Sequence, residues 1–144
     1  MDSGQFQFLA SRLAEKGAYP AEFRTAISRS YYAVFHLGLD LLGSMGFSIP
    51  QNAEAHKEVY RHLNNSGDTD LIKVAAKIDD LRTKRIHADY RLNRSDVESK
   101  ENAKMFVYSA ERIIETMRKC AQGNNRRALI IKNIEDWKNR ITKR

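Results

Sequence analysis

Residues 27–42 of the chain read ISRSYYAVFHLGLDLL, and apolar side chains in this stretch occur at nearly every angle of a helical wheel. No proline interrupts the stretch, and the glycines at positions 43 and 46 mark its end. A helix that is apolar on every side is usually surrounded by other helices, because each face needs a partner that shields it from water. The segment from Ala21 to about Met45 is therefore predicted to be a central, buried helix.

Helical periodicity continues on both sides of this segment. Asp68 or Thr69 is placed to cap one further helix, and Ser95 with Glu98 three residues later has the pattern of a capping box that starts the next. No segment alternates as a strand does. The chain is thus predicted to be an all-α bundle of four to five core helices plus a C-terminal basic helix, over about residues 5–16, 21–45, 53–63, 69–90 and 95–122 and beyond Asn125.

The composition is typical of a well-packed globular protein. The chain has 144 residues, 42% hydrophobic and 30% charged, and its 7 glycines and 2 prolines are too few for a disordered or turn-rich protein. The single cysteine, Cys120, excludes an internal disulfide framework and a multi-cysteine zinc site. The first residues do not have the pattern of a signal peptide, and the apolar run Tyr31–Leu42 is too short to span a bilayer. We therefore expect a cytoplasmic protein that does not enter a membrane.

Positive charge is concentrated at the C-terminal end. The net charge is +7, and residues 123–144 alone contribute +5, with seven basic against two acidic residues. We therefore divide the chain into a helical domain, 1–122, and a basic helical extension, 123–144. Such an extension is typical of contact with nucleic acid, an acidic partner or anionic lipid, and equally of a solvated helix face. Its large apolar side chains share one side, so we expect this helix to pack on its own bundle or on a partner: Ile130, Ile134, Trp137 and Ile141.

A polar stripe runs along the predicted central helix. Four polar residues from Arg29 to Asp40 recur at steps of three or four on a segment that is otherwise apolar. Burying a cation without a partner is costly, so Arg29 must contact a carboxylate, a partner chain or a phosphate. An internal salt bridge to Asp79 or Asp89 is one solution, and the sequence leaves the other two open.

Charged residues replace apolar ones late in the helix predicted over residues 69–90. The apolar stripe of its first half, continued by three or four residues, leads to Arg82, Arg85 and Asp89. Sequence rules often fail in this way at functional sites, although ordinary ion pairs at a basic helix end explain the same pattern. His87 follows Arg82 by five residues, which places the two side chains about 140° apart on a helix. Either the helix ends between them, or a second copy of the chain completes the site.

No other constellation in the sequence predicts metal or cofactor chemistry. The chain has neither a nucleotide-binding glycine loop nor a Ser-His-Asp signature. Glu58 and His62 share a helix face, but two ligands are too few for zinc. The histidines are scattered, with no pair four residues apart, so we expect no metal and no cofactor: His36, His56, His62 and His87.

Three segments follow one another in an order that a known family shares. The first is the run RTAISRSYYAVFH over residues 24–36, and the second is AHKEV over residues 55–59. The third contains Arg82 and His87, followed by the end of the run from Arg85 to Tyr90. Together they resemble the central helix, the short His-Lys segment, the Arg-x4-6-His motif and the Arg-x-x-Ala-Asp-Tyr run of small single-domain prokaryotic HEPN proteins. The resemblance covers about residues 6–117.

The resemblance implies a HEPN-like helical bundle that forms a homodimer with two motifs across one cleft. Many members are metal-independent endoribonucleases, often toxins paired with a minimal nucleotidyltransferase antitoxin. On this interpretation the chain cleaves single-stranded RNA, with His87 as the general acid/base and Arg82 holding the scissile phosphate. Arg29 and Arg85 would extend the phosphate-binding surface, and Tyr90 would stack on a base or orient His87.

The alternative is a non-catalytic HEPN module that binds a nucleotidyltransferase partner, a nucleotide or nucleic acid. Two differences from active members leave it open. Thr83 follows Arg82, where active members often carry Asn, Asp or His. Tyr90 lies three residues after His87, whereas an adjacent His-x-Tyr arrangement marks the members that are modified by adenylylation.

Overall fold

The computed structural model describes residues 1–143, and within them the chain is all-helical and has no strand. The predicted fold class is therefore confirmed. No helix of the described residues combines the length and the apolar character that crossing a membrane requires. The elements are α1 (Gly4–Lys16), α2 (Pro20–Ser44), α3 (Ala55–Asn64), α4 (Thr69–Tyr90), the short 3₁₀ helix η1 (Ser95–Val97), α5 (Lys100–Gln122) and α6 (Asn124–Thr142).

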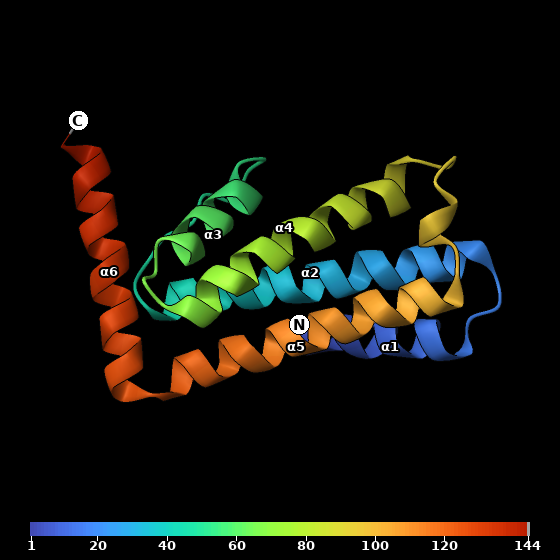
Figure 1. Cartoon of the computed structure of the whole chain (residues 1–144), viewed down its shortest axis with the longest axis horizontal. Helices are drawn as coiled ribbons and strands as arrows, with labels where there is room; N and C mark the ends of the chain where they lie inside the picture. The colour runs from blue at the N-terminus through green and yellow to red at the C-terminus, as the bar shows by residue number, and fades with distance from the viewer. Residues whose placement is uncertain (144) are drawn as a thin grey trace.

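Helix α2 is the centre of the bundle, as its apolar wheel predicts. Helices α1, α4 and α5 pack directly against it, and the short helix α3 lies beside α4 (Figure 1). Helix α6 stands across one end of the bundle, roughly perpendicular to the long helices (Figure 1). Because α3 and α4 both lie along α2, side chains from these three elements meet on one side of the molecule.

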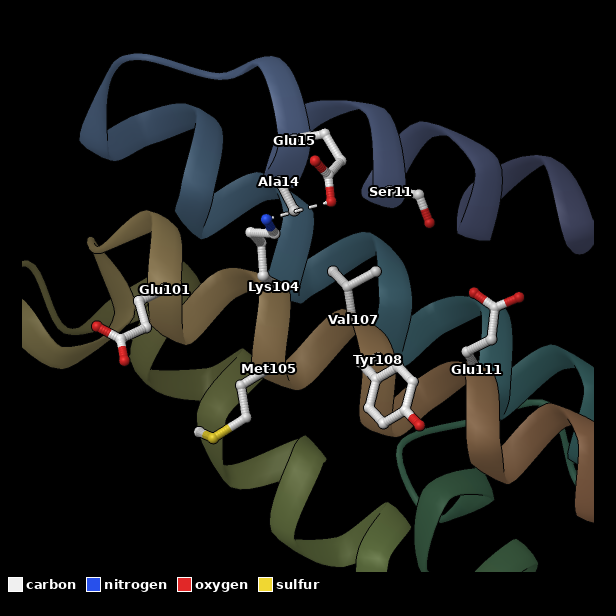
Figure 2. A pocket seen from close by; sticks show the side chains of 9 residues that line it. All are labelled: Ser11, Ala14, Glu15, Glu101, Lys104, Met105, Val107, Tyr108 and Glu111. Atoms are coloured by element: carbon white, nitrogen blue, oxygen red, sulfur yellow. Dashed lines mark ion pairs between the residues drawn. The ribbon is translucent and has the colours of Figure 1, made fainter.

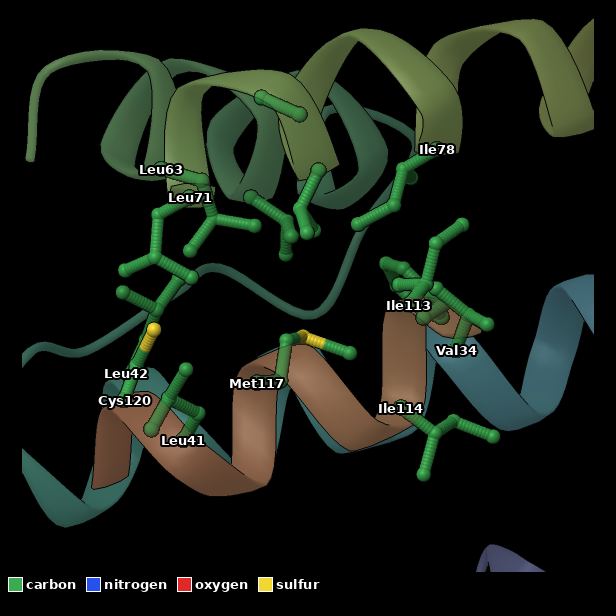
Figure 3. Close-up of a cluster of buried hydrophobic side chains, with 14 of the residues drawn as sticks. Val34, Leu41, Leu42, Leu63, Leu71, Ile78, Ile113, Ile114, Met117 and Cys120 are labelled. Atoms are coloured by element: carbon green, nitrogen blue, oxygen red, sulfur yellow. The ribbon is translucent and has the colours of Figure 1, made fainter. Parts of the chain in front are cut away.

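The main hydrophobic core fills the end of the bundle that α6 covers. It joins buried side chains of α2, α3, α4 and α5, including Leu42, Leu63, Leu71 and Met117 (Figure 3). A second, smaller cluster at the other end contains several alanines, which let the backbones of α1, α2 and α5 approach closely. Its members are Ala10, Ala14, Phe23, Ala26, Ile27, Ala88, Val97, Ala103 and Val107.

Helix α6 packs on its own bundle, which confirms the expectation drawn from its apolar stripe. Ile130, Ile134 and Trp137 are buried in the main core, whereas Ile141 is partly exposed. Arg126 forms ion pairs with Asp68 at 2.7 Å and with Asp70 at 2.8 Å. The hydrogen bonds from this guanidinium are the main reason that the pKa of Asp68 is lowered. One arginine of the basic extension therefore holds α6 against the start of α4.

The two predicted helix starts have different outcomes. Asp68 caps α4 as predicted, since its carboxylate accepts hydrogen bonds from the backbone N–H groups of Asp70 and Leu71. The prediction that Ser95 starts the following helix was wrong. Residues 95–97 form the separate helix η1, and α5 begins at Lys100, capped by the hydroxyl of Ser99. Glu98 forms no capping box with Ser95, because its carboxylate binds Arg24 on α2.

Arg24 ties the end of α4 and the following loop to α2. This residue is only 7% exposed. Its guanidinium donates hydrogen bonds to the Glu98 carboxylate, at 2.6 Å and 3.0 Å, and to backbone carbonyls at the end of α4 and in the loop that follows it. The carbonyls belong to His87, Ala88, Arg91, Leu92 and Arg94.

Replacing Arg24 with alanine is expected to lower the free energy of unfolding by about 3 kcal/mol or more, because the substitution leaves buried carbonyls and one carboxylate without donors. Urea unfolding followed by circular dichroism measures this change. Arg12→Ala, at an exposed position of α1, is the matched control and should stay within about 0.5 kcal/mol of the parent. Equal stability of the two variants would contradict the role given to Arg24.

Replacing Trp137 with alanine is expected to lower the free energy of unfolding by about 3 kcal/mol, because the substitution leaves a cavity between α6 and the bundle. Leu129→Ala on the same helix is the control, since Leu129 is 57% exposed and should tolerate the change. Thermal unfolding followed by circular dichroism compares the two. If both substitutions have the same small effect, α6 does not pack on the bundle in solution.

Candidate functional site

Arg82 projects from α4 into a pocket of about 150 Å³ between α2, α3 and α4, here called the arginine pocket. Within residues 1–143, no carboxylate lies within ion-pair distance of Arg82, and its Nε atom is buried without a hydrogen-bond partner. A partly buried guanidinium without a counter-charge is costly, and an anion in the pocket would relieve that cost. The pocket is lined by Tyr31, His56, Lys57, Tyr60, Ile78, Asp79 and Arg82.

Tyr31 and His56 form a hydrogen-bonded pair in the wall of this pocket. The Tyr31 hydroxyl contacts Nδ1 of His56, and the imidazole stacks on Phe35 with ring centroids 4.2 Å apart. Burial, with the nearby charges of Arg82 and Arg85 acting in the same direction, lowers the pKa of His56 to about 4. Burial also raises the pKa of the Tyr31 phenol well above its ordinary value, against the opposing effect of the same arginines. At neutral pH the pocket therefore holds a neutral imidazole and a neutral phenol beside a cation.

Arg85 lies one turn beyond Arg82 and is buried beneath the site. Its guanidinium is 5.5 Å from the ring centroid of Tyr31 and 5.4 Å from that of Tyr32, and it pairs with Asp89 at 3.6 Å. Asp89 also accepts a hydrogen bond of 3.1 Å from the Ser28 hydroxyl. Arg85 thus has both a counter-charge and aromatic partners, although its buried Nε atom has no hydrogen-bond partner among residues 1–143.

Arg29 does not form the internal salt bridge that the sequence suggested as one solution. The prediction of Asp79 or Asp89 as its partner was wrong, because Asp89 pairs with Arg85 instead. Arg29 lies over aromatic rings, 4.9 Å from the centroid of Tyr32 and 5.1 Å from that of Phe6. Cation–π contacts on a half-buried side chain take the place of the expected carboxylate.

His87 lies on a different side of α4 from Arg82, as their five-residue spacing predicts. Its surroundings are Lys84 and the loop around Arg94 and Asp96, and it does not line the arginine pocket. The pKa of His87 is lowered, first by burial and then by the positive charges of Arg94 and Lys84. The Nδ1 atom of this ring is buried and finds no hydrogen-bond partner in the described part of the chain, residues 1–143. Helix α4 is continuous from Thr69 to Tyr90, so the helix does not end between the two motif residues.

Tyr90 ends α4 with a largely exposed ring. It is 67% exposed, and the Arg85 guanidinium lies 5.9 Å from its ring centroid. The exposed part of this ring is therefore accessible to a ligand, and the ring also lies beside the Arg85 guanidinium.

Sequence reasoning missed the part that α3 plays in the site. His56 was noticed only as a scattered histidine and as part of a family resemblance, and Tyr31 was assigned to the apolar wheel of α2. Lys57 was noticed only as part of the same resemblance, and Tyr60 was not singled out. Only the resemblance of the AHKEV segment indicated a functional role for this helix, because nothing in a linear sequence shows that His56 lies against Tyr31.

A larger pocket, of about 470 Å³, lies between α1 and α5 (Figure 2). Three glutamates line it, Glu15, Glu101 and Glu111, and its one lysine, Lys104, already pairs with Glu15 at 3.5 Å. An excess of carboxylates repels phosphate. This pocket is therefore unsuited to a nucleic acid backbone, in contrast to the arginine pocket.

Comparisons with known proteins add no relative. No family model matches the chain, and neither a curated protein nor a solved structure matches it significantly. Within residues 1–143, no three histidine, cysteine or acidic side chains come together in a way that could hold a metal ion.

The low pKa of His56 predicts that folding stability falls as the pH drops. An unfolded histidine titrates near 6.5, so between pH 6.5 and about 4 the unfolded chain binds a proton that folded His56 does not. This contribution is complete above pH 6.5 and is lost toward pH 4. His62 and His87, whose pKa values are also lowered, act in the same direction.

His56→Asn isolates the contribution of His56, because the asparagine amide retains a polar partner for Tyr31 without titrating in this range. The variant should lose less stability than the parent between pH 6.5 and 4, as measured by urea unfolding. Imidazole NMR signals should show His56 titrating near pH 4 in the folded parent. Titration near pH 6.5 would contradict the buried pair.

Proposed function

We propose that the chain is a metal-independent endoribonuclease that cleaves single-stranded RNA, with Arg82 as the phosphate-binding residue. The observation that carries this proposal is the guanidinium of Arg82, which within residues 1–143 forms no ion pair, although the carboxylate of Asp79 lines the same pocket with a lysine, an imidazole and two phenols. A guanidinium is permanently charged and presents donors in a plane that matches two phosphate oxygens. The resemblance to HEPN ribonucleases supports the same assignment.

RNA can be cleaved without a metal because its own 2′-hydroxyl serves as the nucleophile. A base removes the hydroxyl proton, the 2′-oxygen forms a bond to the adjacent phosphorus, and the bond to the 5′-oxygen of the next nucleotide breaks. That departing oxygen takes a proton from an acid, and a 2′,3′-cyclic phosphate remains. The protein must therefore supply proton transfer and stabilise the negative charge on the phosphate.

His87 is the proposed acid/base residue, and a second copy of the chain brings it to the phosphate. His56 is closer to Arg82 in the same chain, but its pKa of about 4 makes it a weak base at neutral pH, and Tyr31 occupies its Nδ1 atom. Because His87 and Arg82 lie on different sides of α4, the proposal requires a homodimer in which the two helices α4 face one cleft.

The remaining residues of the proposed site contribute in different ways. Arg29 is half-buried and has no carboxylate partner among residues 1–143, so it extends the phosphate-binding surface, and exposed Tyr90 offers a ring on which a base can stack. Arg85 is 7% exposed and paired with Asp89, so it contributes positive charge from its buried position beneath the site and does not contact the RNA directly. A toxin role and a minimal nucleotidyltransferase antitoxin remain proposals that rest on the family resemblance.

One observation favours a second candidate, a non-catalytic module that binds RNA, a nucleotide or a nucleotidyltransferase partner. Within one chain, His87 does not line the arginine pocket that holds Arg82. If no dimer brings them together, the chain retains a phosphate-binding pocket without its acid/base residue. This candidate predicts RNA binding that depends on Arg82 and no cleavage product.

Purified protein incubated with single-stranded RNA in EDTA tests the two candidates. His87→Ala is expected to slow cleavage by about 10²- to 10⁴-fold, the usual contribution of an acid/base group. Arg82→Ala and Arg82→Lys are both expected to lose activity, because lysine cannot replace the planar guanidinium. Arg118→Ala, at an exposed position of α5, is the control and should cleave at the parent rate.

Native mass spectrometry of the same samples measures the oligomeric state. A dimer is expected for the parent and for every variant. Cleavage that is equally fast in the parent and in His87→Ala would overturn the assignment of His87. A strict monomer that cleaves RNA would overturn the shared cleft.

A further inference from the structure

A second pocket shares His56 with the arginine pocket. Its volume is about 360 Å³, within the usual range of small-molecule sites. Because His56 lines both pockets, the two adjoin at this residue. Because Gln51 and Asn52 of the loop before α3 line the second pocket, it is here called the amide pocket, and its other lining residues include Phe35, His36 and Leu39.

Aromatic rings from two helices line the amide pocket. His56 of α3 stacks on Phe35 of α2 with an interplanar angle of 21°, and the half-buried ring of His36 meets Phe35 edge-on with centroids 5.4 Å apart. Together with Leu39 these rings form a largely aromatic wall for a flat, unsaturated ligand. No carboxylate or ammonium group lines the pocket.

The loop supplies hydrogen-bonding groups beside this wall. The Oδ1 atom of Asn52 accepts a hydrogen bond of 2.8 Å from the Glu54 backbone N–H, which orients the amide and leaves its NH₂ group free to donate. The amide of Gln51 has no partner among the described residues and can both donate and accept. Both side chains are exposed, so they are accessible to a ligand.

We propose that the amide pocket binds a nucleobase, with the phosphate of the same nucleotide at Arg82. A nucleobase combines a planar aromatic face with an edge that carries both donors and acceptors, and this matches the wall and the amides. A sugar lacks the planar aromatic face, and an aliphatic peptide side chain lacks both features. The placement of the phosphate rests on the proposed function, because it uses Arg82 as the phosphate-binding residue.

Titration with small ligands tests this site without RNA cleavage as a readout. The probes are ribose 5-phosphate and the four ribonucleoside 5′-monophosphates, and the measurement is the NMR shift of the His36 and His56 imidazoles. At least one nucleotide is expected to bind about tenfold more tightly than ribose 5-phosphate. The reason is that the base of the nucleotide stacks on aromatic side chains, whereas ribose 5-phosphate has no base. Arg82→Ala should weaken both kinds of ligand.

Variants of the loop and of the wall locate the base. Gln51→Ala and Asn52→Ala should weaken nucleotide binding about two- to tenfold and leave ribose 5-phosphate unaffected. His36→Ala should lower the affinity for nucleotides about tenfold and leave the affinity for ribose 5-phosphate unchanged. Asn139→Ala, which deletes an exposed amide on α6, is the matched control and should bind every probe as the parent does. Because Gln51 and Asn52 are exposed loop residues, their substitution should leave the circular dichroism spectrum unchanged.

The outcomes separate this inference from the proposed function. If no nucleotide binds more tightly than ribose 5-phosphate, or if the loop and His36 variants bind nucleotides like the parent, the nucleobase site is overturned even when RNA is cleaved. A nucleotide preference that depends on Gln51, Asn52 and His36, in a protein that does not cleave RNA, supports the nucleobase site and overturns the endoribonuclease.

Discussion

The arrangement of the site depends on the guanidinium of Arg24. This one buried side chain pairs with Glu98 and binds backbone carbonyls at the end of α4, which no donor within that helix can reach. Since Arg24 belongs to α2, the interaction fixes the end of α4 against the central helix. The side of α4 that carries Arg82 and Arg85 is thereby held toward the aromatic rings of α2.

Two arginines one turn apart on α4 lie against that aromatic surface, and they differ in whether a carboxylate balances their charge. Arg85 has a carboxylate, Asp89, and three tyrosine rings around it, so its charge is balanced where it is buried. Arg82 has no such partner within residues 1–143. Their combined positive charge adds to burial in keeping the imidazole of His56 neutral. Arg85 therefore acts as part of the scaffold, whereas the charge of Arg82 is available to a ligand.

Local patterns in the sequence were sufficient to predict the helices but not the contacts between them. The apolar wheel of residues 27–42 correctly predicted a buried helix, and Asp68 was recognised as a cap because a cap acts within four residues. The start of α5 was misplaced because Glu98, which resembles half of a capping box, binds Arg24 from 74 residues away. Arg24 was noted only as the first residue of the run that resembles a known family, and its role was missed because most of its partners are backbone carbonyls. The contact of His56 with Tyr31 is equally long-range, and the same limitation hid it.

The continuity of α4 decides how the Arg-x4-His motif can operate. A helix that ended after Arg82 would let both motif side chains turn toward one ligand, but α4 continues to Tyr90, with His87 directed toward Lys84 and the loop around Asp96. Arg24 holds the backbone in this helical position, because its guanidinium donates a hydrogen bond to the carbonyl of His87 itself. A site that uses both residues therefore needs two helices α4 from two chains. Within one chain, the imidazole in the arginine pocket is that of His56, whose Nδ1 atom contacts Tyr31 and whose pKa is lowered to about 4. The proposed acid/base role of His87 therefore depends on the oligomeric state.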